Sequence, residues 1–295
     1  MSTRDFLVAL ALIEGAFILL DLVDRHLTRA SRYGGARLRP AAVVFFGAVC
    51  ALFVVVQLGL AALAPNAERL VAAIRAALGG PAQPPPGPRG VVLVALSVAL
   101  FYVAGFWDYL WHRCFSHSRW FWFTHEYHHL PNQVFVGMPG IFARPFAVAT
   151  TIPVAAATAA TTFLALRLFR WPLWDWTIFH LPLLLSAAVL TASHSSFLRR
   201  SWWSHRIMRS FALTTPHEHL LHHTVDLVGN YGNFTSLWDR LLGTYLDPRR
   251  PERQGRRVGL GYDQDFLGTL TLGLLRVPPE WRRRAQLDRY CNLDG

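Results

Sequence analysis

The sequence has no lysine, few acidic residues and only three cysteines. All 29 basic residues are arginine, against 18 acidic ones, and charged residues make up 16% of the chain, below the roughly 25% of an average globular domain. The cysteines Cys50, Cys114 and Cys291 are scattered, which excludes a disulfide framework and fits a reducing compartment. No G-x-G-x-x-G nucleotide loop and no haem-binding cytochrome motif is present. Electrons for any redox reaction must therefore come from another protein.

The sequence contains several long runs of apolar residues. Apolar residues make up 53% of the chain, and a helix of about 20 such residues crosses a bilayer. The first run is too long and too weakly punctuated to be only a cleaved signal peptide. The sequence predicts an all-α, polytopic membrane helical bundle of about four to five spans, at Phe6 to Val23, Ala41 to Ala64, Val91 to Trp111, Phe146 to Phe169 and Pro172 to Ala192.

Arginine placement predicts the orientation of this bundle. The turn from Asp24 to Pro40 carries five arginines, whereas the longer, proline-rich connector from Pro65 to Gly90 carries three. By the positive-inside rule the first turn is cytoplasmic, and alternation through the spans puts residues 112–144 and all residues after 192 on that side. The net charge of +11 suits anionic lipid headgroups beside the membrane, so no nucleic-acid partner is expected.

Histidines concentrate in three boxes on these cytoplasmic segments. On a helix, positions i, i+3 and i+4 share one face and can aim three rings at one point. Eight histidines exceed the four-coordinate shell of zinc but suit two octahedral iron ions with a position open for dioxygen. The boxes are HRCFSH with His112 and His117, HEYHH with His125, His128 and His129, and HEHLLHH with His219, His222 and His223.

The second box can also be interpreted as the H-E-x-x-H motif of a zinc protease, with Glu126 as the base. It follows RWFWFT, an aromatic stretch typical of the membrane boundary, and a protease would leave most of the clustered histidines unused. Glu126 is therefore expected to support a ligand or lie at the surface. A metal-binding scaffold or transporter is a further, non-enzymatic alternative, although Glu14, Asp175 and His180 are too few for a pathway through the spans.

From about residue 100 to 280 the chain resembles the fatty acid hydroxylase and sterol desaturase superfamily of integral-membrane non-haem di-iron enzymes. The resemblance rests on DYLWHRCFSH, HEYHH, TPHEHLLHH and the ending NYGNFTSLWDRLLGTY. It implies a ninth ligand, His194 in TASHSSF, and places all nine histidines at a di-iron centre. One departure is the spacing of the first box, which has four intervening residues where relatives have three. Positions i and i+5 of a regular helix diverge by about 140°, so either the helix breaks near Cys114 or His112 and His117 serve different irons.

Several residues are expected to support these ligands. Asp108, one turn before His112, is expected to accept the proton of the outer nitrogen of that ring. Asn233 and Asp239 in the family-like ending are expected either to hydrogen-bond to the third box or to form a structural turn. His217, at a variable position of the third box, is expected to be exposed. His205, beside arginines, is expected at the membrane interface.

The prediction is an O2-dependent di-iron hydroxylase of a fatty-acyl, sterol or related membrane lipid, with its catalytic face in the cytoplasm. Lipid desaturation by the same site is the alternative reaction. The predicted parts are membrane helices and a connector at 1–90, a catalytic domain at 91–280 and a tail at 281–295. The expected partners are a lipid substrate, which enters from the bilayer, and an external electron donor, either a ferredoxin or a cytochrome with its reductase.

Overall fold

The computed structural model describes residues 3–32, 90–129, 134–136, 151–168, 176–225 and 228–260, with single positions at 55, 62, 69, 73, 76 and 77. Every regular element in these residues is a helix, as predicted. Extended pairing over the same residues is limited to two isolated bridges, Leu213 with Thr235 and Thr224 with Val258. The described part of the chain is therefore all-α.

Within the described residues, four long helices are rich in apolar residues: α1 (Thr3–Arg32), α3 (Val91–Trp111), α6 (Ile152–Leu168) and α7 (Trp176–His194). Among the residues that the structure describes, two segments are long and apolar enough to cross a membrane, Arg4–Asp24 and Val91–Ser116, and they contain the spans predicted at Phe6 and Val91. Shorter apolar segments occupy α6 and α7 at Ile152–Leu164 and Ile178–His194. The span predicted at Ala41 to Ala64 lies almost entirely outside the described residues.

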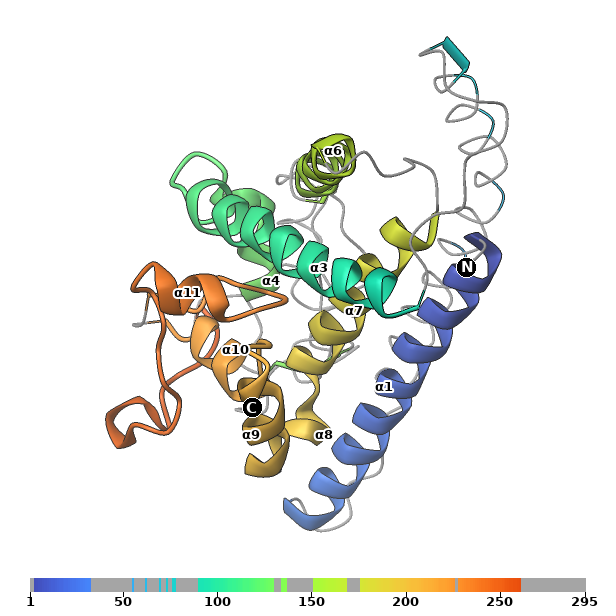
Figure 1. Ribbon diagram of the computed structural model, residues 1–295. Coiled ribbons are helices and arrows are strands. Elements are labelled where there is room, and N and C mark those ends of the chain that lie inside the picture. The colour runs from blue at the N-terminus through green and yellow to red at the C-terminus, as the bar shows by residue number, and fades with distance from the viewer. Residues whose placement is uncertain are drawn as a thin grey trace, which may run out of the picture.

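Helix α7 is central among these helices, because α1 and α3 both pack against it and α6 packs on α3 (Figure 1). Leu100 of α3 and Ile178 of α7 form a small buried core between them. The outward side of α1 is different: Leu12 is 68% exposed and Leu19 is 62% exposed. Large apolar side chains presented in this way are suited to lipid rather than water.

After α7 the chain forms a cap of short helices: α8 (Ser196–Arg199), α9 (Trp202–Ser210), α10 (Pro216–His222), α11 (Leu237–Leu241) and the 3-10 turn η3 (Pro251–Arg253). The cap is drawn in colours from gold to orange in Figure 1. Trp238 donates from Nε1 to the Tyr102 carbonyl over 2.9 Å, which fastens α11 to α3. Gly105 allows this approach, because a Cβ there would lie 2.3 Å from the Thr235 side chain.

A buried aspartate of α1 fixes the segment that follows α7. Asp21 is fully buried, and its carboxylate accepts hydrogen bonds from the backbone N–H groups of Val136, Ser196 and Phe197 over 2.8, 3.1 and 3.2 Å. The Ser195 hydroxyl donates a fourth, over 2.7 Å. The N-terminal helix therefore holds the start of α8, directly after His194.

Candidate metal centre

A π-helical turn at the end of α3 sets the geometry of the first histidine box. The turn, η1, spans His112–Ser116, and the His117 N–H donates to the His112 carbonyl over 3.1 Å, an i+5 to i bond. Because this turn takes one residue more than an α-helical turn, His117 returns to the side of His112. The two Nε2 atoms lie 3.2 Å apart. The change of helix pitch thus lies at Cys114, and both histidines face the same group.

The second and third boxes occupy short helices that face η1. His125 follows the 3-10 turn η2 (Trp122–Thr124), and α4 (Glu126–His129) carries the rest of the second box. Helix α10 begins with a capping box: the Thr215 side chain accepts from the Glu218 N–H over 3.2 Å, and Glu218 accepts from the Thr215 N–H over 3.0 Å. Such a cap fixes the first turn of a helix, and with it the positions of the third-box histidines.

All nine predicted histidines come together, in two groups. Within each group, one candidate ligand atom per residue lies within 4.8 Å of every other. The second and third boxes each contribute to both groups, so the two groups are neighbours. The first group contains five residues, His112, His117, His125, His129 and His222; the second contains four, His128, His194, His219 and His223.

The ring nitrogens in each group point at one another. In the first group, Nε2 of His112 lies 2.8 Å from Nε2 of His125, and Nε2 of His117 lies 3.3 Å from Nε2 of His222. In the second group, Nε2 of His194 lies 3.3 Å from Nε2 of His128 and 2.8 Å from Nε2 of His219, and Nε2 of His223 lies 3.1 Å from Nε2 of His219. Lone pairs therefore converge at two points.

Backbone carbonyls outside the groups orient three of these rings. Nδ1 of His112 contacts the Tyr231 carbonyl, Nδ1 of His194 lies 2.7 Å from the Leu190 carbonyl, and Nδ1 of His222 lies 3.1 Å from the Gly229 carbonyl. A carbonyl can only accept, so each Nδ1 carries the hydrogen and each Nε2 keeps a lone pair directed inward.

Asp108, Asn233 and Asp239 form one network behind His112. The Asp108 carboxylate accepts from the backbone and side-chain nitrogens of Asn233 over 2.9 and 3.0 Å, and the Asn233 amide nitrogen lies 3.2 Å from Nδ1 of His112. Asp239 accepts from the Tyr231 and Gly232 N–H groups over 2.8 and 2.9 Å, which fixes the carbonyl that His112 contacts. Asn233 and Asp239 of the family-like ending therefore support the first box. Asn230 of the same ending supports the third box, because its side-chain nitrogen donates to the Glu218 carbonyl over 3.0 Å.

Comparison with known proteins agrees with this geometry. The sequence profile described as fatty acid hydroxylase matches residues 97–244. The chain belongs to the fatty acid hydroxylase family. The resemblance to the fatty acid hydroxylase and sterol desaturase superfamily is thus confirmed. The matched range contains all nine histidines and lies inside the predicted catalytic domain, whereas α1 and Asp21 lie outside it. No curated protein and no solved structure matches the chain significantly.

Burial keeps several of the clustered histidines of this fatty acid hydroxylase family member neutral. Loss of solvent is the main cause that lowers the pKa of His125, His129, His219 and His223 well below the usual 6.5, and repulsion from neighbouring rings adds to it. Burial also lowers the pKa of His222, to about 4. These imidazoles are therefore unprotonated at neutral pH, which is the form that binds metal.

The donor set fits a metal. Nε2 of His129 is buried and has no hydrogen-bond partner among the described residues, although it belongs to the five-histidine group. A buried nitrogen without a partner costs about 1–3 kcal/mol, and a bound cation would remove this cost. Five and four imidazole nitrogens suit metals that accept nitrogen ligands, iron among them.

The sequence did not reveal several residues that hold the site. Asp21 was one, although an acid within an apolar run is itself a sign of function. His205, expected at the interface, is buried, with Nδ1 2.8 Å from the Thr215 hydroxyl that caps α10. His217, expected to be exposed, is half-buried and stacks on Trp202 with ring centroids 4.0 Å apart. His205 thus supports the cap of α10, whereas His217 lies in the first turn of α10 and packs on α9. The T-x-x-E pattern at the start of α10 was the available indication.

Proposed function

We propose that this protein is an O2-dependent di-iron hydroxylase of a membrane lipid. The observation that carries the proposal is the convergence of nine histidines into adjacent groups of five and four. Family membership and the two apolar helices support a membrane setting. The described apolar surface of α1 favours a lipid substrate that enters from the bilayer.

The size of the groups favours two irons over one zinc. A structural zinc closes at four ligands and a catalytic zinc keeps three protein ligands with an open position, so a five-imidazole group exceeds both. Two iron ions held there would supply the activation of dioxygen and the removal of hydrogen from an unactivated C–H bond. His125 and His129 meet three further histidines, which makes the zinc protease a poorer explanation of HEYHH.

The protein's own residues hold the ligands and exclude water. The π turn places His112 and His117 on one side, and carbonyls hold the outer nitrogens of His112, His194 and His222. His219 and His223 are almost fully buried. A dry site limits the loss of reactive species to solvent, so we expect the lipid chain, rather than water, to meet the open side of the groups.

The reaction requires two electrons from outside the chain. We propose a ferredoxin or a cytochrome with its reductase as the donor, on the cytoplasmic face that arginine placement predicts. Desaturation shares the first removal of hydrogen and differs in whether a second hydrogen is lost or oxygen is added. The histidine geometry is the same for both reactions.

Two measurements test the proposal. Purified protein should contain two irons per chain, and lipids from cells with the gene should gain the mass of one oxygen atom. The His219→Ala variant should lose both metal and product. The matched control is His217→Ala, which removes a neighbouring histidine outside both groups. Stoichiometric zinc with peptide cleavage would overturn the hydroxylase, and so would unchanged lipids in cells that contain iron-loaded protein. A lipid product that has lost two hydrogen atoms would identify a desaturase.

A further inference from the structure

An arginine-lined cleft lies in the cap, outside the two histidine groups. It has a volume of about 660 Å³ and is bounded by α9, α11 and the segment that includes η3. Its lining is formed by Trp202, His205, Arg206, Arg209, Ser210, Arg240, Arg249 and Gln254. A concave site of this size is suited to a small ligand, whereas a protein partner generally needs a broader face.

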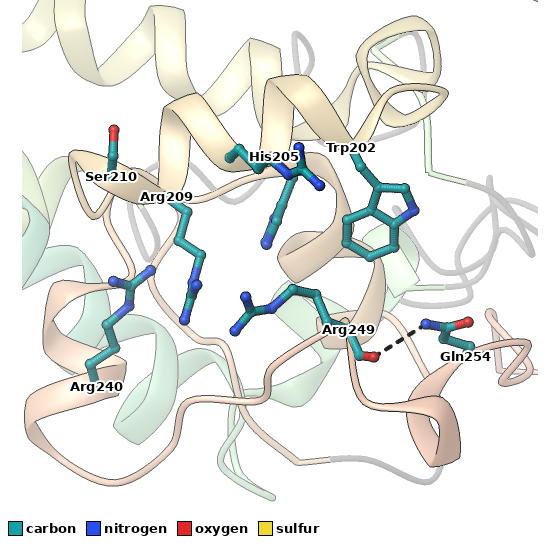
Figure 2. Close-up of a pocket in the computed structure, with 8 residues that line it drawn as sticks. Trp202, His205, Arg209, Ser210, Arg240, Arg249 and Gln254 are labelled. Atoms are coloured by element: carbon teal, nitrogen blue, oxygen red, sulfur yellow. Dashed lines mark hydrogen bonds between the residues drawn. The ribbon is translucent and has the colours of Figure 1, made fainter.

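The cleft concentrates positive charge. The guanidinium groups of Arg209, Arg240 and Arg249 point toward a common centre (Figure 2). Asp247 lies 2.6 Å from Arg249 and 3.9 Å from Arg209, and the buried Glu218 lies 3.5 Å from Arg240. Arg206 forms no ion pair within the described residues. Four arginines thus face two carboxylates, and two positive charges remain without a counterion.

Several nitrogens at the cleft also lack a hydrogen-bond partner. The Nε atoms of Arg209 and Arg240 are buried without a hydrogen-bond partner among the described residues, and so is Nε2 of His205. Leaving a buried donor unpaired is costly, more so when the donor is charged. Converging guanidinium groups also repel one another. An anion with several oxygens would satisfy these donors and neutralise the excess charge, and phosphate matches the planar fork of arginine.

The position of α9 indicates that this anion belongs to a lipid at the membrane surface. Trp203 and Ile207 lie four residues apart on α9, and Phe211 caps its C-terminal end; they are 69%, 41% and 63% exposed. This apolar stripe lies beside Arg206, an arrangement typical of helices at a membrane surface. Asp24, the last residue of the first candidate span, pairs with Arg200 and accepts from the Ser196 hydroxyl over 2.8 Å. The cap therefore joins α1 where its apolar segment ends, at the depth of lipid headgroups.

We propose that the cleft binds the phosphate of an anionic phospholipid headgroup while the apolar stripe of α9 contacts the acyl region. The arginines hold the phosphate oxygens, and Trp202 forms an apolar wall beside them. The proposal concerns a site separate from the histidine groups and stands whichever reaction they perform. It also accounts for the exposed aromatic residues of α9, which water alone would disfavour.

The test uses the full-length protein in a neutral detergent. Short-chain phosphatidylglycerol and phosphatidylcholine are titrated separately, and bound lipid is counted by native mass spectrometry. We expect one phosphatidylglycerol per chain, bound about tenfold more tightly than phosphatidylcholine. Arg206→Gln and Arg249→Gln should each weaken this binding about fivefold or more. Arg250→Gln is the matched control, because this neighbouring arginine is exposed and does not line the cleft, and it should leave binding unchanged.

Other outcomes would overturn the proposal. Equal binding of the two lipids, or variants that bind like the wild type at the same metal content, would reject a site for an anionic headgroup. Inorganic phosphate that displaces phosphatidylglycerol at equal concentration would identify a soluble anion as the ligand. An acidic ferredoxin whose binding needs Arg206 and Arg249 and is insensitive to phosphatidylglycerol would identify a protein docking site instead.

Discussion

Replacement of Asp21 by alanine should empty the second histidine group while leaving the first group metal-loaded. The side chain of Asp21 accepts the N–H groups of Val136 and Ser196 in buried surroundings. It also holds Ser195, which directly follows the ligand His194. The first group depends on α3, η1, α4 and α10, and in the described residues Asp21 makes no hydrogen bond to any of these elements.

The expected loss follows from the groups that would remain unsatisfied. In the segment from His194 to α8, two buried donors would lose their acceptor, the Ser195 hydroxyl and the Ser196 N–H. Each costs about 1–3 kcal/mol, so this segment should be destabilised by about 2–6 kcal/mol. A change of 1.4 kcal/mol is tenfold in an equilibrium constant, and a penalty of this size is enough to release a ligand segment locally. The free energy of unfolding of a native protein is about 5–15 kcal/mol, so the fold as a whole can survive this loss.

The measurements are metal content per chain and hydrogen exchange of the peptide that contains α8. The variant should retain about half of the wild-type metal, and its α8 amides should exchange faster. Asp5→Ala is the matched control, because this acid lies on the same helix but is exposed. Full metal content with unchanged α8 exchange would refute the role of α1. The milder Asp21→Asn should give an intermediate result if alanine prevents folding.

Three further variants or conditions test the centre itself. Deletion of Cys114 should preserve the metal of the first group, because His112 and His117 would then lie about 40° apart on a regular helix. Insertion of an alanine after Cys114 should remove this metal. A higher metal content in the insertion variant than in the deletion variant would refute the role of the π turn. Asn233→Ala should lower the metal affinity of the first group by about 10–100-fold in chelator competition, and an unchanged affinity would show that the network behind His112 is dispensable. The pKa of His222 is about 4 when folded and about 6.5 when unfolded, so the unfolded chain binds more protons in between. Metal-free protein should therefore lose about 3 kcal/mol of stability from His222 alone as pH falls from 6.5 to 4, and the lowered pKa values of His125, His129, His219 and His223 add to this loss. Denaturant midpoints that stay constant over this range would contradict the prediction.

The sequence predicted the helical class and the histidine boxes because both depend on the spacing of residues that are close together in the sequence. Apolar runs of bilayer length and triplets at i, i+3 and i+4 need no knowledge of distant contacts. The lone His194 was available only through resemblance to the family, since one histidine after an apolar run has no pattern of its own. The structure brings it to the same group as His219.

Other features depended on contacts that local patterns cannot contain. Asp21 binds residues 115 and 175 positions away, so nothing around it in the sequence indicates its partners. His205 was assigned to the interface because arginines flank it, yet its contact with Thr215 buries it. Spacing in the first box left two alternatives, and the choice between them required the backbone hydrogen bond from His117 to His112.

The π turn has a consequence for how this family can vary. A turn that closes one residue later accommodates an extra amino acid while the helix before it and the loop after it keep their places. Two spacer lengths can then present the same pair of rings, and evolution can lengthen or shorten this motif by one residue without rebuilding its surroundings. Cys114 and Arg113, which occupy the bulge, point outward. Search patterns with a fixed gap in the first motif would overlook such chains, and a pattern that permits either length would recover them.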